Sequence, residues 1–143
     1  MAQKKGKFSE KYGPNEKPDP AIREKILELT QIDEVACAVA FEIVQELGIT
    51  PAEVGKTIDL MEYRIVKCQL GLFGYKPGHS IVEPKLPEND QITEAIKTRT
   101  VNETLACATA WEIATLLHVP KTTVGNACEA LNIKIKPCQL GAF

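Results

Sequence analysis

Apolar residues recur every three or four positions through the first third of the chain, which predicts helices with one buried face. Ile22, Ile26 and Leu29 form the first stripe, in a helix that begins at Asp19-Pro20, a capping acid followed by proline. Since this spacing continues along the chain, we expect further helices of the same amphipathic kind.

A second helix is predicted over residues 33–47, where Val35, Val39 and Ile43 keep the helical spacing and Gly48 follows as a typical C-terminal residue. A third helix begins at Thr50, because the sequence Thr-Pro-Ala-Glu is a capping box with proline in the first turn.

Short alternating segments follow the third helix and predict strands at residues 64–66 and 133–136. A single strand cannot satisfy its own backbone hydrogen bonds. Its partner is either a hairpin strand after the turn at Gly71 or the equivalent strand of a second repeat, and the sequence leaves both open.

The chain contains an internal repeat. Residues 22–73 align with residues 92–143 at a constant offset of 70, and 19 of the 52 aligned positions are identical. We therefore predict a mainly α fold made of two three-helix units with short β segments, packed pseudo-symmetrically. The expected organisation is a flexible basic arm (1–18), a first unit (19–73), a linker (74–88) and a second unit (89–143).

The charge of the chain is close to balanced, with 17 Lys+Arg and 19 Asp+Glu and a net charge of -2. Only the N-terminal segment is net basic, since residues 1–20 carry five Lys and three acids, whereas residues 21–74 carry five basic and nine acidic side chains. No apolar run is long enough to span a membrane. With no signal segment and no C-x-x-C motif among five cysteines, we expect reduced thiols and a cytoplasmic location.

The second and third helices and the turn between them resemble the helix-turn-helix of bacterial transcription regulators. The first repeat carries this pattern in Val44, Gly48, Ile49 and Val54, and the second in Ala114, His118, Val119 and Val124. Each unit, with its following strand, looks like a small winged-helix domain in which the Cys-Gln-Leu-Gly element lies where the wing starts.

This resemblance implies a DNA-binding regulator whose third helix enters the major groove. The DNA contacts that it implies in the second unit offer a cation, two hydroxyls and an amide suited to adenine: Lys121, Thr122, Thr123 and Asn126. The first unit and the arm add three cations: Lys56, Lys4 and Lys5. The first unit's third helix also carries Glu53, Asp59 and Glu62, which repel phosphate, so the second unit is the better candidate.

Several residues recur in both repeats outside the predicted cores. Gly55 and Gly125 lie inside the third helices, where glycine costs about 1 kcal/mol relative to alanine, so we expect a close backbone neighbour that is either DNA or another protein segment. The Cys-Gln-Leu-Gly elements repeat Cys68, Gln69 and Gly71 as Cys138, Gln139 and Gly141. Of the thiols, Cys68 and Cys138 are expected to be the accessible ones.

Glu42 and Glu112 are also identical, and we expect them, with Gln69 and Gln139, to hydrogen-bond backbone near these elements. Neither glutamate has a recurring partner for acid–base chemistry, so no enzymatic activity, catalytic residue or cofactor is predicted.

The leading hypothesis is therefore a DNA-binding transcriptional regulator with double-stranded DNA as its partner. One alternative is a protein-interaction or dimerisation module that binds no nucleic acid. Another is a thiolate metal site, but the 31-residue separation between paired cysteines matches no zinc motif, and no metal ligand is assigned.

Overall fold

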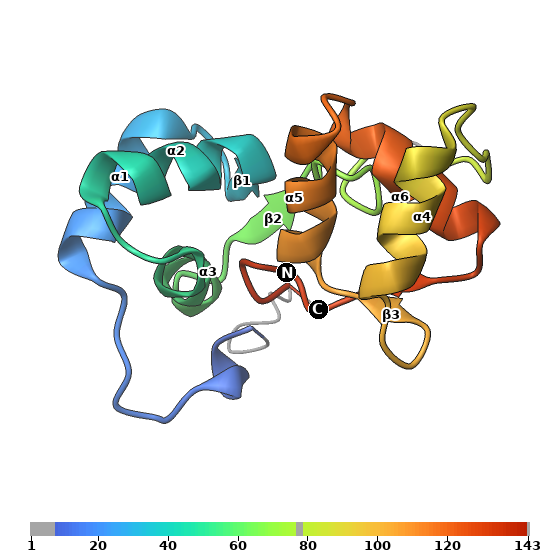
Figure 1. Cartoon of the computed structure of the whole chain (residues 1–143). Helices are drawn as coiled ribbons and strands as arrows, with labels where there is room; N and C mark the ends of the chain where they lie inside the picture. Colours follow the sequence, from blue (N-terminus) through green and yellow to red (C-terminus); the bar gives the residue numbers. More distant parts are fainter. Residues whose placement is uncertain (1–7, 77–78, 143) are drawn as a thin grey trace. The chain divides into compact units, whose positions relative to one another are not determined.

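The computed structural model describes residues 8–76 and 79–142, and within them the protein is mainly helical with short strands. The predicted DNA contacts Lys4 and Lys5 lie outside the described residues. The chain divides into two compact units, Met1–Val66 and Lys67–Phe143, and Figure 1 draws the first in blue to green and the second in green to red.

Unit 1 holds three helices whose ends follow the sequence signals. They are α1 (Pro20–Leu29), α2 (Cys37–Leu47) and α3 (Pro51–Leu60), preceded by the short 3-10 helix η1 (Ser9–Lys11). The Asp19 side chain accepts hydrogen bonds from the backbone of the first turn of α1, and Thr50 and Glu53 form the predicted capping box of α3. Gly48 ends α2 with φ +65°, a conformation that favours glycine.

The second helix begins four residues later than predicted. Residues 34–36 form the strand β1 (Glu34–Ala36), which pairs in parallel with β2 (Arg64–Val66) in the register Val35 opposite Ile65. Val35 is fully buried. The spacing of Val35 and Val39 is compatible with a helix, but the backbone of β2 needs hydrogen-bond partners, and these three residues supply them.

Neither partner predicted for the strand after the third helix is the observed one. In both units this strand pairs in parallel with the short strand before the second helix, so the helix-turn-helix forms the crossover between two neighbouring strands. A wing is an antiparallel hairpin. In the described residues both two-stranded sheets are parallel, and the winged-helix form of the prediction is not confirmed.

Unit 2 repeats this order of elements. It contains α4 (Asp90–Arg99), β3 (Thr104–Leu105), α5 (Cys107–Leu116), α6 (Lys121–Ala130) and β4 (Lys134–Ile135). Its core gathers Ile92 and Ile96 of α4, Ile113 of α5 and Val124 of α6. None of the helices in the described part of the chain is long and apolar enough to cross a membrane.

The Cys-Gln-Leu-Gly element of the first repeat packs in unit 2. Cys68 and Leu70 belong to the same buried cluster as α4, α5 and α6, and Leu70 has no exposed surface. The first compact unit ends at Val66, whereas the first sequence repeat continues to residue 73. The C-terminal part of the first repeat therefore completes the core around the helices of the second repeat.

Candidate functional site

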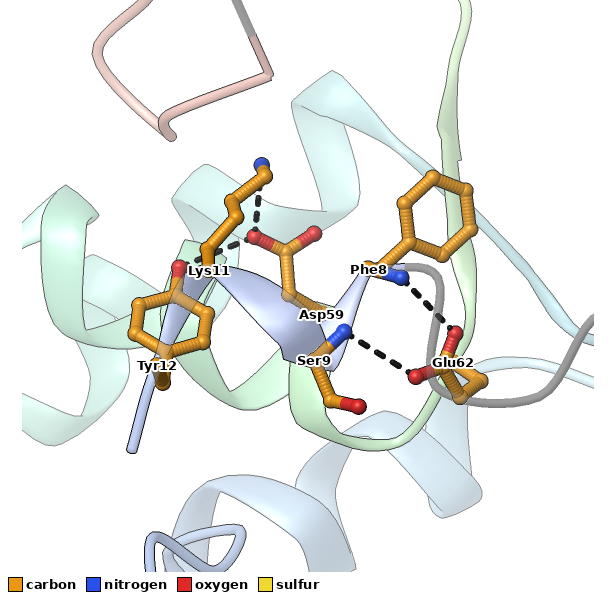
Figure 2. A network of polar contacts seen from close by, with 6 residues as sticks. All are labelled: Phe8, Ser9, Lys11, Tyr12, Asp59 and Glu62. Carbon is orange, nitrogen blue, oxygen red and sulfur yellow. Dashed lines mark hydrogen bonds and ion pairs between the residues drawn. The ribbon is translucent and has the colours of Figure 1, made fainter. Parts of the chain in front are cut away.

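In unit 1, the segment of residues 8–16, here called strap 1, is bonded to the third helix and the turn after it (Figure 2). The backbone N–H groups of Phe8 and Ser9 donate to the two carboxylate oxygens of Glu62, at 3.1 and 3.0 Å. The Nζ of Lys11 and the hydroxyl of Tyr12 donate to Oδ2 of Asp59, at 3.0 and 2.9 Å. Strap 1 therefore neutralises part of the acidic charge that α3 carries.

Asp59 is only 4% exposed, and Lys11 and Tyr12 supply it with two hydrogen-bond donors. Partial burial, followed by the hydrogen bond to Asp59 and its negative charge, raises the pKa of Tyr12 to about 12. Each effect disfavours the phenolate, so the Tyr12 hydroxyl remains a hydrogen-bond donor throughout the neutral range.

Lys56, one of the predicted DNA contacts, is also engaged by strap 1. Its Nζ lies 2.7 Å from Oε1 of Glu16 and 5.4 Å from the centre of the Tyr12 ring. Because this ammonium already has a carboxylate and an aromatic partner, a DNA phosphate would have to compete with both.

The third helix of unit 2 is covered by an equivalent segment, residues 80–85, here called strap 2. The backbone N–H of Glu83 donates to Oδ1 of Asn126 at 2.9 Å, and that of Lys85 donates to the Asn126 carbonyl at 3.3 Å. Asn126 corresponds to Lys56 at the repeat offset of 70. The structural repeat therefore extends N-terminally beyond the aligned residues, and both straps engage the same position of the third helix.

Gly125 has the close backbone neighbour that its position predicts. A Cβ added at this residue would lie 2.3 Å from the carbonyl oxygen of Leu70 and 3.5 Å from Cγ1 of Val82. The neighbour is thus the Cys-Gln-Leu-Gly element, with strap 2 beside it. Gly55, the equivalent residue of α3, is buried.

The remaining predicted DNA contacts lie in the first turn of α6. Lys121, Thr122 and Thr123 are each half-buried. The Nζ of Lys121 lies 4.6 Å from the centre of the Trp111 ring. Their role in DNA binding stays a prediction.

All five cysteines are free thiols, and only Cys138 is partly exposed. The prediction of an accessible thiol is confirmed for Cys138 and wrong for Cys68, which is 6% exposed because its element packs into the core of unit 2. In the part of the chain that the structure describes, no group of three or more His, Cys, Asp or Glu side chains is arranged to hold a metal ion.

We predicted that Glu112 and Gln139 hydrogen-bond backbone groups near the Cys-Gln-Leu-Gly element, but among the described residues neither side chain does so. The Gln139 amide donates to Sγ of Cys107 at 3.5 Å. Glu112 and its counterpart Glu42 are exposed, and neither takes part in a hydrogen bond or ion pair among the described residues. The two glutamates thus point to solvent from the same position of α2 and α5. Gly71 and Gly141 have φ +87° and +83°, which explains glycine at both positions.

A shallow groove of about 590 Å³ crosses the outer face of α5. Its lining combines apolar and charged side chains: Arg99, Ala108, Trp111, Glu112, Thr115, Leu116 and Gln139. Leu116 is 62% exposed, so a large apolar side chain of this lining faces solvent. Sequence reasoning did not find this groove, because its lining combines the end of α4, one face of α5 and the turn at Gln139, which are distant in the sequence.

A second hollow of about 560 Å³ lies between α6, β4 and residues 72–73. Its lining includes Phe73, Cys128 and residues 133–136, the segment that contains β4. Its charged lining residues are one acid and two lysines, Glu129, Lys134 and Lys136.

Comparisons with protein-family models, with curated proteins and with solved structures find no match to this chain.

Proposed function

We propose that this protein is an interaction module that associates with a second copy of itself through the groove on α5. The observation that carries the proposal is the composition of the groove, whose lining combines apolar side chains with one cation and one anion. Such a surface is complementary to itself across a two-fold axis, where each residue of a contacting pair meets the other on the partner copy.

The apolar side chains of the groove supply the area to be buried. Ala108, Trp111 and Leu116 line it together. Ala108 is exposed, and its small side chain lets a facing helix approach α5 closely. Aromatic side chains in the centre of an interface commonly contribute much of the binding free energy.

The charged residues set the orientation of the two copies. Arg99 Nη1 donates to the Ala95 carbonyl at 3.3 Å, and no ion pair joins Arg99 to Glu112 among the described residues. In a two-fold arrangement Arg99 of one copy faces Glu112 of the other, and the pair forms twice. Arginine is suited to this role because its planar fork can bind both carboxylate oxygens.

The internal repeat carries part of this face in both units. Ala108 and Glu112 are identical to Ala38 and Glu42, and all four residues are exposed. Burial in a core does not account for identity at exposed positions one helical turn apart. The third helices are less suited to an external partner, since straps 1 and 2 occupy Lys56 and Asn126.

Sedimentation equilibrium of charge-reversal variants tests this proposal. Arg99→Glu and Glu112→Arg each place like charges opposite one another twice, and we expect each to weaken association at least about 10-fold. The double variant restores opposite charges and recovers the dimer. Glu42→Arg is the matched control, because it makes the same charge reversal at the equivalent position of unit 1. In that unit Leu29 stands in place of Arg99, so the ion pair has no counterpart there. A wild-type chain that stays monomeric at ~100 μM would refute the proposal.

A second candidate is weak DNA binding through the first turn of α6. This turn contains Lys121, Thr122 and Thr123 and no acidic residue, whereas the first turn of α3 contains Glu53. Helix N-termini of this kind attract phosphate. Fluorescence anisotropy with a random duplex at ~50 mM salt tests it: binding that Lys121→Glu abolishes supports DNA contact here, and absence of binding excludes it.

A further inference from the structure

We propose that Cys107 and Cys138 form a reversible disulfide, so that the N-terminus of α5 is a redox modification site. The inference is independent of self-association. It rests on three contacts that place the two residues side by side, and on the exposure of one thiol next to the burial of the other.

The backbone brings the two residues together. Beyond the β3–β4 pair, Lys136 N donates to the Leu105 carbonyl at 2.9 Å, and Cys107 N donates to the Pro137 carbonyl at 3.1 Å. Cys138 directly follows that carbonyl. This second hydrogen bond holds the backbone of Cys107 against the residue that precedes Cys138, so the two cysteines are close neighbours although 31 residues separate them in the sequence. A disulfide needs its two Cα atoms to lie close together, and this bond supplies that proximity.

The side chain of Cys107 is directed toward the same turn. Its sulfur accepts a hydrogen bond from the side-chain amide of Gln139, the residue after Cys138. Sγ of Cys107 is therefore held beside the side chain that directly follows Cys138. Cys128, by contrast, is 1% exposed and lies in α6.

The difference in exposure gives the two thiols different roles. Cys138 is the only partly exposed cysteine of the five, so it is the one that a soluble oxidant reaches. Burial, with the nearby Cys138 and Cys68 thiols adding to it, raises the pKa of Cys107. Cys107 is therefore a poor first nucleophile in solution, but its position suits it to the second, intramolecular step.

The oxidant is a small disulfide such as oxidised glutathione. The Cys138 thiolate attacks one sulfur of that disulfide, forming a mixed disulfide and releasing one glutathione thiolate. The Cys107 thiolate then attacks the Cys138 sulfur, forms the protein disulfide and releases the second glutathione thiolate. Overall, two protein thiols are oxidised, one small disulfide is reduced to two thiols, and the two protons pass to the released thiolates.

Incubation of the folded protein with oxidised glutathione, followed by alkylation and peptide mapping without reductant, tests the proposal. We expect the five free thiols to fall by two, with a Cys107–Cys138 link in a chain of monomeric mass. The Cys107→Ser variant should instead accumulate a mixed disulfide on Cys138, and Cys138→Ser should keep its four thiols. Circular dichroism verifies that each variant is folded.

Cys128→Ser is the matched control, since it removes a buried thiol of the same unit and should leave the disulfide unaffected. Three results would overturn the proposal: a link between Cys68 and Cys107, a stable mixed disulfide on Cys138 in the wild type, or five unchanged thiols.

Discussion

The contact between Gly125 and the Leu70 carbonyl makes a prediction that opposes the usual effect of the substitution. In an exposed helix interior, Gly→Ala stabilises a protein by about 1 kcal/mol. In α6 the added Cβ would lie 2.3 Å from a backbone oxygen, well inside van der Waals contact. That oxygen belongs to Leu70, which is fully buried and cannot move without disturbing the core of unit 2.

Overpacking a core costs about 1–3 kcal/mol, and a rigid backbone atom calls for the upper end of that range. After subtracting the ~1 kcal/mol of helix propensity, Gly125→Ala should reduce the free energy of unfolding by ~2 kcal/mol, measured by urea denaturation. Gly13→Ala is the control, because nothing lies within 4 Å of its added Cβ. A Gly125→Ala variant as stable as the wild type would refute the close approach of Leu70 to α6.

Three further predictions concern the straps and the buried thiol. Tyr12→Phe should cost about 1 kcal/mol, because Asp59 loses one donor, and tyrosine absorbance in the wild type should show one group titrating near pH 12 that this variant lacks. Asn126→Ala should cost about 1 kcal/mol in urea denaturation and speed hydrogen exchange at Glu83, whose N–H loses its acceptor. Burial raises the pKa of Cys128 to about 11 from an ordinary 9.0, so the unfolded chain loses this proton first. Stability should therefore be full below pH 9 and fall by up to ~2 kcal/mol toward pH 11, a loss that Cys128→Ala reduces.

The helices could be predicted because their signals are local. The capping box at Thr50 and Glu53 and the left-handed Gly48 depend on neighbours within a few residues, and the structure contains both. The stripe of Ile22 and Ile26 likewise identifies the buried face of α1. Such features need no knowledge of the rest of the chain.

The parts that sequence reasoning missed depend on contacts between distant residues. Glu34–Ala36 becomes a strand because Arg64–Val66, 30 residues later, needs a partner. Strap 1 is rich in polar residues and resembles a disordered arm, and its contacts with Asp59, Glu62 and Lys56 order it. Polar contacts of this kind leave no periodic signal in a sequence.

The Cys-Gln-Leu-Gly element shows the same limit. Its recurrence is plain in the sequence, and a wing was a reasonable expectation for a segment after a helix-turn-helix. The burial of Leu70 against the helices of the following repeat depends on tertiary packing that the 70-residue periodicity does not encode.

The most direct test of self-association through α5 uses the single tryptophan of the chain, Trp111, as a reporter in the groove. Its emission and the sedimentation mass should be followed together during serial dilution. We predict that emission shifts to longer wavelength over the same concentrations at which the mass falls from dimer to monomer. A fall in mass with unchanged Trp111 emission would place the contact elsewhere and contradict the account.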